Sequence, residues 1–520
     1  MFKKLFSIIG LGILIIPVAF SQPIRSVADF DKGWHFHLGD VTNGQDPTLN
    51  DNNWRALNLP HDWSIEGQFS KDAPATTGGG ALPGGIGWYR KTFTVPESSK
   101  GKITYIDFDG VYEKSDVWIN GHHLGFRPNG YISFRYELTP YLNYGTKPNI
   151  IAVKADNSAQ PNSRWYSGSG IYRNVWLVTT GRLAIDHWGT FVTTPKVSSA
   201  SASVNLGVKI RKFAGKISPY SVKTTIYNAA GVAVANRVTN NISTGDTITT
   251  INQKFEVTKP TLWSVAKPYL YKVVSQVIAN NTVIDEYTTP LGIRYFKFDA
   301  DKGFSLNGKP LKILGVCDHH DLGSLGAALN TRALQRQLEI LKSMGVNGIR
   351  TSHNPPAPEL LDLCDKMGFI VMDEAFDCWE KGKSKFDYHL YFAKWHKKDL
   401  QDQILRDRNH PSVFIWSIGN EIPQQSDTSA LRIAPQLRAI VHSLDKTRPI
   451  TTANNDPSPK NQVIKSGALD LVGYNYAEKE FPGFHDRYPG KIFIGTETTS
   501  AIATRGHYDM PSDSIRRWPG

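Results

Sequence analysis

Alternation of apolar and polar residues dominates the first third of the chain, up to about residue 182. Typical runs are WYRKTFTV at 88–95 and KITYIDFDGV at 102–111, separated by turns rich in glycine and proline. Asn120-Gly121 stands between two apolar runs, which is a strong signal for a type I′ hairpin turn. Many short strands of this kind predict a jelly-roll β-sandwich over residues 22–182.

A second β-rich segment covers residues 183–293. Its clearest hairpin is YSVKTTIYNAAGVAVANRV at 220–238, and a further strand is LYKVVSQVIAN at 270–280. The segment holds about a hundred residues, the size of an immunoglobulin-like β-sandwich. Since it has no cluster of histidines or carboxylates, we expect a structural role for it.

From residue 294 the pattern changes to strands that alternate with amphipathic helices, which favours βαβ units and a parallel sheet. Seven strand candidates end in polar residues: LKILGVCDHH (311–320), NGIRTSH (347–353), FIVMDEA (369–375), VFIWSIGNE (413–421), PITTANN (449–455), LVGYNYA (471–477) and KIFIGTET (491–498). They describe most of a (β/α)8 TIM barrel. The tail after them is polar, so the sequence predicts a barrel over 294–520 that is truncated after strand 7 and poorly soluble or nearly inactive.

The first 21 residues have the pattern of a secretory signal peptide. Lys3 and Lys4 precede an apolar run, Leu5–Phe20, and the small residues around Ser21 suit a signal peptidase. Pro17 and the shortness of the run argue against a membrane anchor. We therefore expect an exported protein, periplasmic or extracellular, that does not insert into a membrane once the signal peptide is removed.

Composition narrows the class of protein further. Charged residues are 20% and aromatic residues 11% of the chain, with 13 tryptophans, which is typical of a globular protein with ample core material. The three cysteines, Cys317, Cys364 and Cys378, are an odd number without zinc-site spacing. The net charge of +12 is scattered, which argues against nucleic acid as a partner and is compatible with anionic polysaccharides. No cofactor is expected, and the oligomeric state stays open.

Two glutamates stand at the ends of the fourth and seventh strand candidates. Glu421 follows the apolar run 413–418, where a buried carboxylate is costly, and Glu497 ends the run KIFIGTE. The carboxyl ends of barrel strands form the active site, and a pair of glutamates there is what a retaining glycosidase needs. We predict Glu421 as general acid/base, with a pKa raised by desolvation, and Glu497 as nucleophile, kept ionised by a cation such as Arg350.

Other polar residues at the strand ends complete the predicted site. The predicted substrate-binding residues are His319, Arg350, His353, Asp373, Asn420 and Tyr476. Imidazoles suit sugar hydroxyls, although a histidine at a strand end is often only a satisfied hydrogen-bond donor. Asn420 suits the hydroxyl next to the anomeric centre, and Tyr476 suits the nucleophile. Asp373 and Glu374 compete as catalytic candidates and are interpreted as supporting residues.

Two stretches resemble the signatures of glycoside hydrolase family 2. DRNHPSVFIWSIGNE at 407–421 is similar to its acid/base signature, and NGIRTSHNPP at 347–356 is similar to a second one, except that Asn354 stands where Tyr is usual. The resemblance covers nearly the whole chain after the signal peptide, in the domain order of the family. It implies the same roles for the two glutamates, and a sugar site lined by His319, His353, Asn420 and Tyr476.

Within the family, the segments WSIGNEI and GVCDHHDLG look most like the exported β-galactosidase branch. The resemblance implies hydrolysis of terminal β-D-galactosides of a β-linked oligosaccharide or polysaccharide by double displacement. A β-glucuronidase of the same family is one alternative, and a non-catalytic carbohydrate-binding protein on a degenerate barrel is another. Magnesium-dependent members place a Glu and a His where Cys378 and Glu380 stand here. Because a thiol is a poor ligand for a hard cation, no catalytic metal is expected.

Overall fold

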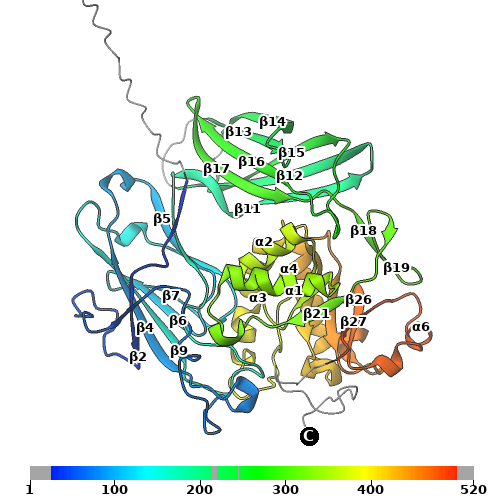
Figure 1. The fold of residues 1–520 in the computed structure, drawn as a ribbon. Helices are drawn as coiled ribbons and strands as arrows, with labels where there is room; N and C mark the ends of the chain where they lie inside the picture. Colours follow the sequence, from blue (N-terminus) through cyan, green and yellow to red (C-terminus); the bar gives the residue numbers. More distant parts are fainter. Residues whose placement is uncertain (1–24, 214–218, 244, 500–520) are drawn as a thin grey trace, which may run out of the picture.

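Three bodies make up the molecule in a computed structural model that describes residues 25–213, 219–243 and 245–499. Figure 1 shows a β-sandwich in blue and cyan, a second β-sandwich in cyan and green, and a parallel sheet with helices in green to red. The fold class predicted from the sequence is confirmed. The predicted signal peptide, 1–21, and the polar segment from residue 500 onward lie outside the described residues.

The first sandwich contains ten strands among the described residues: β1 (Ser26–Asp29), β2 (Trp34–Leu38), β3 (Arg55–Leu57), β4 (Gly85–Phe93), β5 (Ile103–Phe108), β6 (Ser115–Ile119), β7 (His122–Arg127), β8 (Phe134–Glu137), β9 (Asn149–Asn157) and β10 (Val175–Thr180). They form two sheets, in the orders β1-β10-β5-β8 and β3-β2-β4-β9-β6-β7. Alternate residues such as Val117 and Ile119 are fully buried between the sheets. Asn120 and Gly121 both have positive φ, as the hairpin turn between β6 and β7 requires.

The second sandwich packs a three-stranded sheet against a four-stranded one. Its strands are β11 (Leu183–Val197), β12 (Ser201–Lys212), β13 (Tyr220–Tyr227), β14 (Ala233–Ile242), β15 (Ile248–Thr258), β16 (Tyr271–Ala279) and β17 (Thr282–Leu291). The two sheets have the orders β11-β12-β15 and β14-β13-β16-β17. Inward residues Val204 and Val208 of β12 meet Val222 and Val273 of the facing sheet, so the alternation seen in the sequence produces the core.

The third body is a seven-stranded parallel sheet with strands in chain order. The strands are β21 (Gly315–Asp318), β22 (Gly348–Thr351), β23 (Ile370–Glu374), β24 (Val413–Asn420), β25 (Ile450–Asn454), β26 (Leu471–Asn475) and β27 (Ile492–Glu497). The sheet curls until its first and last strands approach each other. Cys317 Sγ on β21 lies 3.2 Å from the carbonyl oxygen of Thr496 on β27 and donates a hydrogen bond to it. A short antiparallel sheet precedes it, formed by β18 (Phe296–Asp299), β19 (Gly303–Leu306) and β20 (Lys309–Pro310).

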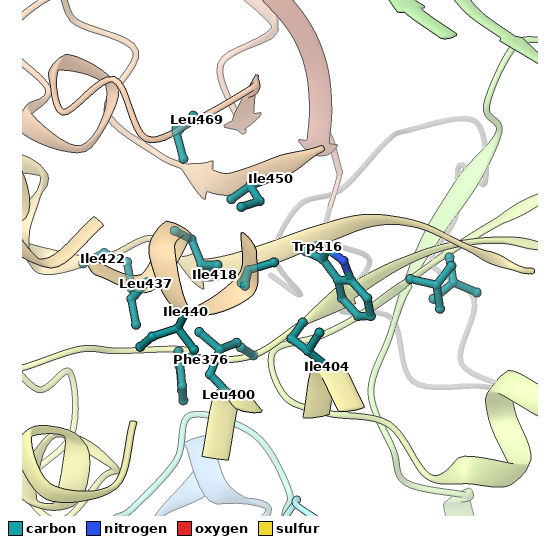
Figure 2. Packing of buried hydrophobic residues seen from close by; sticks show 14 of the residues in the cluster. Phe376, Leu400, Ile404, Trp416, Ile418, Ile422, Leu437, Ile440, Ile450 and Leu469 are labelled. Carbon is teal, nitrogen blue, oxygen red and sulfur yellow. The ribbon is translucent and has the colours of Figure 1, made fainter. Parts of the chain in front are cut away.

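Helices cover the outside of the curled sheet: α1 (Thr331–Ser343), α2 (Pro358–Met367), α3 (His389–Asp407), α4 (Ala430–Leu444), α5 (Gln462–Lys465) and α6 (Phe484–Arg487). All eight residues of β24 are buried, which explains its almost continuous apolar run. Figure 2 shows Trp416 and Ile418 of β24 in one hydrophobic cluster with Ile404 of α3 and Leu437 of α4. Among the described residues, no helix is both long and apolar enough to cross a membrane.

The first sandwich docks on the third body through buried arginines. Arg127 at the end of β7 pairs with Asp399 at 2.5 Å and with Asp402 at 2.7 Å, both on α3. Arg173 donates to the carbonyl oxygens of Pro355 and Pro356, which follow β22. These contacts hold the segment between β9 and β10 over the carboxyl ends of the parallel strands.

Candidate active site

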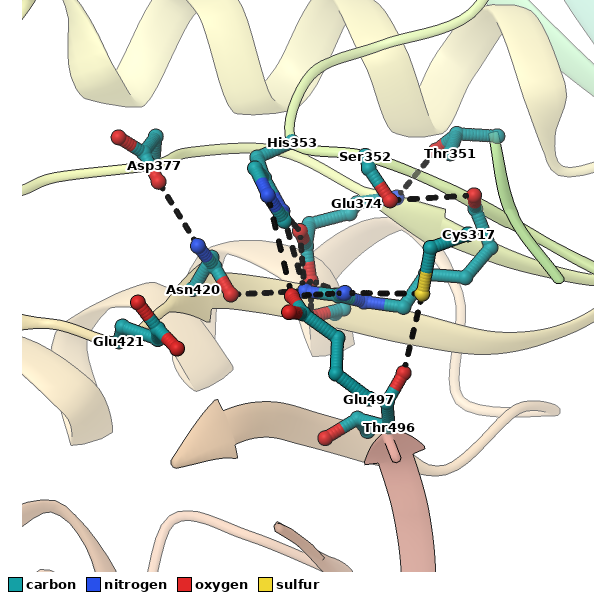
Figure 3. A network of polar contacts seen from close by, with 12 residues as sticks. Cys317, Thr351, Ser352, His353, Glu374, Asp377, Asn420, Glu421, Thr496 and Glu497 are labelled. Atoms are coloured by element: carbon teal, nitrogen blue, oxygen red, sulfur yellow. Dashed lines mark hydrogen bonds and ion pairs between the residues drawn. The ribbon is translucent and has the colours of Figure 1, made fainter. Parts of the chain in front are cut away.

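Arg350 near the end of β22 is the centre of a polar cluster at the carboxyl ends of the parallel strands. Figure 3 shows Glu374, Asn420 and Glu497 gathered in this cluster. Its guanidinium donates to Glu374 Oε1 of β23 at 2.8 Å, to Glu497 Oε1 of β27 at 2.7 Å and to Asn420 Oδ1 of β24 at 2.8 Å. Arg350 is buried and Glu374 is fully buried. A bidentate arginine in such a position fixes the relative places of four strand ends.

Glu497 is held as a carboxylate by its neighbours. Burial alone would raise the pKa of Glu497, but the charges of Arg350 and His353 and a hydrogen bond from the Tyr476 side chain hold it below its usual value. His353 Nε2 lies 3.8 Å from Glu497 Oε1. An ionised, partly buried carboxylate at this place is suited to nucleophilic attack.

Glu421 directly follows β24 and lies in a different environment. Its Oε1 accepts a hydrogen bond from the neutral amide of Asn475 at 3.1 Å, and Arg164 Nη2 lies 3.9 Å from its Oε2. Glu421 has a positive φ of 42°, and its backbone N–H donates to the carbonyl oxygen of Ala453 at 2.7 Å. Left-handed backbone at a residue other than glycine is unfavourable and concentrates at functional sites. The turn brings the carboxyl group of Glu421 to the same end of the sheet as that of Glu497 (Figure 3).

Asn420 lies between the two glutamates with its amide orientation fixed. Its Oδ1 accepts from Arg350 at 2.8 Å and from Asn475 at 3.2 Å, and its Nδ2 donates to Asp377 Oδ1 at 2.8 Å. Because the amide is held at both ends, its remaining N–H direction is preorganised for a hydroxyl group of a ligand.

The two predicted histidines face each other. The rings of His319 and His353 are 5.3 Å apart, and His353 Nδ1 lies 2.9 Å from Glu374 Oε1. Burial, with the charge of His353 as the next cause, lowers the pKa of His319 to about 4. His319 is therefore a neutral imidazole at neutral pH, which can both donate and accept a hydrogen bond to a sugar hydroxyl.

Asp373 is the predicted residue that the structure does not bring to this cluster, which corrects the expectation for it. Its Oδ1 accepts from Gln403 of α3 at 2.7 Å, on the outer side of the sheet. Successive residues of a strand point to opposite faces, so Glu374 points to the cluster and Asp373 points away from it. Burial and the neighbouring Asp407 raise the pKa of Asp373. Its place is in the packing between β23 and α3.

Sequence reasoning missed three residues of this site, Asp377, Arg164 and Trp165. Asp377, just after β23, accepts from Arg164 at 2.9 Å and from Lys383 at 2.8 Å. Burial alone would raise the pKa of Asp377, but Lys383, His353 and Arg164 hold it well below its usual value. Arg164 belongs to the first sandwich, 213 positions earlier in the chain, so no local pattern links it to Asp377.

Trp165, next to Arg164, also reaches the site from the first sandwich. Its ring lies 5.3 Å from that of His319 and 5.4 Å from that of His353. An aromatic ring beside imidazoles and carboxylates is a typical wall for the apolar face of a sugar. The sequence gives 13 tryptophans, and nothing in its pattern distinguishes this one.

The two positions discussed for magnesium have other contacts. Cys378 Sγ donates to Asp387 Oδ1 at 3.4 Å, and Glu380 pairs with Arg432 at 2.7 Å. Such a donor set does not fit a hard cation, and metal independence stays a prediction. One group of three metal-capable side chains occurs among the described residues, formed by Asp362, Asp365 and His410.

That group is better explained as an ion pair. Burial alone would lower the pKa of His410, but Asp365, 2.7 Å away, raises it to about 9. A protonated imidazole is not a metal ligand.

A parallel barrel sheet with one glutamate after its fourth strand and another at the end of its seventh, attached to two β-sandwiches, defines the class of multidomain glycoside hydrolases. The chain belongs to glycosyl hydrolase family 2. Its residues 47–181 match the family's sugar binding domain, 184–294 match the central family domain, and 299–493 match the TIM barrel domain.

Relatives of known name support this assignment. The chain is 51% identical over 526 residues to beta-galactosidase BoGH2A of Bacteroides ovatus, a match that covers 95% of this chain and 62% of that protein. It is 30% identical to a beta-glucuronidase of Bacteroides fragilis, over 96% of this chain and 70% of the other. A solved structure of a family 2 member from Bacteroides cellulosilyticus superposes with a TM-score of 0.88 at 40% identity, covering 91% of this chain and 61% of that one. The chain thus spans about three fifths of the length of two of these relatives.

Proposed function

We propose that the protein is a retaining exo-β-galactosidase that hydrolyses terminal β-D-galactosides of a glycan. The observation that carries the proposal is the contrast between the two strand-end glutamates. Glu497 is held as a carboxylate by Arg350, 2.7 Å away, whereas Glu421 accepts its hydrogen bond from a neutral amide and has Arg164 only at 3.9 Å. One carboxylate ready to attack and a second one able to carry a proton are the two groups that double displacement requires.

In the first step a carboxylate oxygen of Glu497 attacks the anomeric carbon while the bond from that carbon to the leaving oxygen breaks. Glu421 gives its proton to the leaving oxygen, which departs as an alcohol. In the second step Glu421, now ionised, takes a proton from water as the water oxygen attacks the anomeric carbon and releases Glu497. In this proposal Asn420 and the imidazole of His319 bind hydroxyl groups of the sugar.

Galactose as the sugar is supported by the 51% identity with the Bacteroides ovatus β-galactosidase. The second candidate is a β-glucuronidase, because a Formosa agariphila relative, 40% identical over 93% of this chain, carries the name putative beta-glucuronidase. A panel of p-nitrophenyl β-galactoside, β-glucuronide, β-mannoside and β-glucoside tests both. We expect the highest kcat/KM with the galactoside, and preference for the glucuronide would replace galactose in the proposal.

Retention is tested on the best substrate of that panel by proton NMR. The first sugar released should be the β anomer, with the α anomer appearing only later by mutarotation. Glu497→Gln should abolish the signal, while Glu339→Gln, an exposed glutamate on α1, should leave it unchanged. Initial release of the α anomer would exclude double displacement.

We also propose export to the periplasm or the medium, because residues 1–21 have the order of a signal peptide. Cell fractionation of the full chain should find the protein outside the cytoplasm with residue 22 as its first residue. Retention of the full-length protein in the cytoplasm would contradict this part of the proposal.

A further inference from the structure

A cavity lies between the immunoglobulin-like sandwich and the barrel, apart from the two glutamates. Its volume is about 310 Å³, and its wall includes Arg294, Arg408 and Arg448. Arg294 follows β17, Arg408 follows α3, and Arg448 precedes β25. No aspartate or glutamate is among the described residues that line it. A cavity walled by three arginines and no carboxylate is strongly electropositive.

Arg448 is compensated inside the protein. Its Nη1 pairs with Asp445 Oδ2 at 2.7 Å, and its other nitrogens donate to the carbonyl oxygens of Val413 and His410. A buried arginine with a carboxylate partner and satisfied donors is a normal structural ion pair. It therefore needs no external ligand.

Arg294 has no such partner. Its Nη2 donates to the carbonyl oxygen of Val413 at 3.0 Å, and its guanidinium stacks over Phe414 at 4.7 Å. Its Nε–H is buried and unpaired, and it takes part in none of the ion pairs found in the described ranges. Burial, followed by the charge of Arg448, lowers the pKa of Arg294 to about 9.

Within the described residues Arg408 also takes part in no ion pair, and it is even less exposed than Arg294. Only 5% of it is accessible to solvent. Its three donor contacts are long, 3.2 to 3.4 Å, and all go to backbone carbonyl oxygens, those of Leu444, Trp188 and Thr190. Its Nε–H is also buried and unpaired within the described structure. Asp445, which pairs with Arg448, is the carboxylate whose charge acts on both Arg294 and Arg408, so three guanidinium groups share it and positive charge is left in excess at the cavity.

We infer that this cavity binds a tetrahedral oxyanion, a sulfate or phosphate group, through the guanidinium groups of Arg294 and Arg408. The planar guanidinium forms charge-assisted hydrogen bonds with such groups at fixed geometry, and both side chains line the cavity. The assignment is independent of the proposed hydrolysis, because the cavity contains none of the strand-end residues of that site.

The source of the oxyanion is either a free ion or an ester group on a sugar. A volume of about 310 Å³ exceeds what a sulfate ion fills and leaves room for an attached hexose. A groove of about 710 Å³ shares Thr193, Arg408 and Thr447 with the cavity, and its wall carries three lysines, Lys209, Lys254 and Lys446, against one carboxylate, Asp445. It offers a cationic path for a sulfated saccharide, which the net charge of +12 also favours.

Calorimetric titration of the full chain with sodium sulfate tests the site, with sodium chloride at equal ionic strength as the blank. We expect saturable binding of sulfate and none of chloride. Arg294→Met and Arg408→Met should each weaken sulfate binding about tenfold or more, because each loses one charge-assisted hydrogen bond. Lys302→Met, an exposed lysine in the turn between β18 and β19, is the matched change of charge outside both the cavity and the groove and should retain the affinity within about twofold.

Thermal unfolding gives a second readout that a purely structural role of Arg294 would not produce. Without sulfate, Arg294→Met should unfold at the wild-type temperature or above it, because the variant removes a desolvated guanidinium that Arg448 repels. With saturating sulfate, the unfolding temperature of the wild type should rise about 3 °C more than that of the variant. Sulfate stabilises both proteins non-specifically, and this common effect cancels in the difference between them. An equal gain in both proteins, or equal binding of sulfate and chloride, would overturn the inference.

Galactose 6-sulfate, galactose and inorganic phosphate distinguish the sources of the anion. Tighter binding of the sugar sulfate than of sulfate assigns the site to a sulfated saccharide. Binding of sulfate or phosphate with no gain from the sugar assigns it to the free ion. Binding of unsulfated galactose with the same affinity as its sulfate would contradict an oxyanion site.

Discussion

At the scale of single residues, Arg350 connects three other polar residues of the site. It contacts Glu374, Glu497 and Asn420, and its charge lowers the pKa of Glu497. Asn420 directly precedes Glu421, so Arg350 also contacts the neighbour of the second glutamate. The ionisation of Glu497 therefore depends on contacts that can be changed one residue at a time.

Glu421→Ala should affect substrates according to their leaving groups. Alkyl β-galactosides need protonation of the leaving oxygen and should lose about 10²–10⁴-fold in kcat/KM, whereas activated aryl galactosides should lose much less. Azide should restore turnover and give a β-glycosyl azide, since the site of the missing carboxylate admits a small nucleophile. Glu497→Ala should lose activity on both kinds of substrate. Identical behaviour of the two variants, with azide product from neither, would refute the assignment of roles.

Arg350→Lys should move the acidic limb of the kcat/KM profile. A single ammonium group cannot contact Glu374 and Glu497 together as the forked guanidinium does. The pKa of Glu497 should rise, so a higher pH is needed to ionise the nucleophile and the acidic limb shifts toward neutral pH. We expect a loss of about a hundredfold at the optimum as well, from misplacement of the carboxylate. Arg332→Lys on the exposed face of α1 is the control and should leave the profile unchanged.

At the scale of elements, the loop between α3 and β24 is attached to α2 by an ion pair. His410 Nδ1 lies 2.7 Å from Asp365 Oδ2, and the backbone N–H of Ser412 donates to the other oxygen of Asp365. This places β24, and with it Asn420 and Glu421, at a fixed height in the sheet.

The pair makes the stability of the protein depend on pH. The pKa of His410 is raised to about 9 in the folded protein, against about 6.5 in an unfolded chain. Its stabilisation is fully present below about pH 6.5 and is lost as the pH rises to about 9. Between these values the wild type should lose about 2–3 kcal/mol of unfolding free energy relative to His410→Gln, measured by denaturant unfolding. Parallel pH curves of the two proteins would contradict the role of the pair.

The sequence predicted the strands and helices better than it predicted the directions in which their side chains point. The seven parallel strands could be located because each is a buried apolar run that ends in polar residues, and the run before Glu421 is buried over its whole length. Asp373 and Glu374 could not be separated, since two adjacent carboxylates at a strand end differ only in the face they point to. Arg164 and Asp377 could not be paired, because 213 positions separate them and the contact depends on how one domain docks on another.

At the scale of the whole molecule, the site is built by two domains. Arg164 and Trp165 come from the first sandwich, and all the strand-end residues come from the barrel. The buried arginines Arg127 and Arg173 hold the two domains together. Substrate binding should therefore depend on a part of the chain that carries neither glutamate.

Trp165→Ala should lower kcat/KM about 10–100-fold, because a ring that would cover the sugar is lost. The temperature of unfolding should change little, since the ring is only partly buried. Phe69→Ala removes an exposed ring of the same sandwich and should leave both quantities unchanged. A wild-type kcat/KM in Trp165→Ala would show that this wall does not contact the substrate.

The docking of the first sandwich over the strand ends also has a consequence for how such proteins diversify. The glutamates and Arg350 belong to one module, and the wall formed by Arg164 and Trp165 belongs to another that is made earlier on the ribosome. Recombination that exchanges the early module would replace the wall and leave the bond-breaking groups intact. Lineages could thus acquire new glycan preferences by shuffling a domain, without passing through forms that have lost their chemistry.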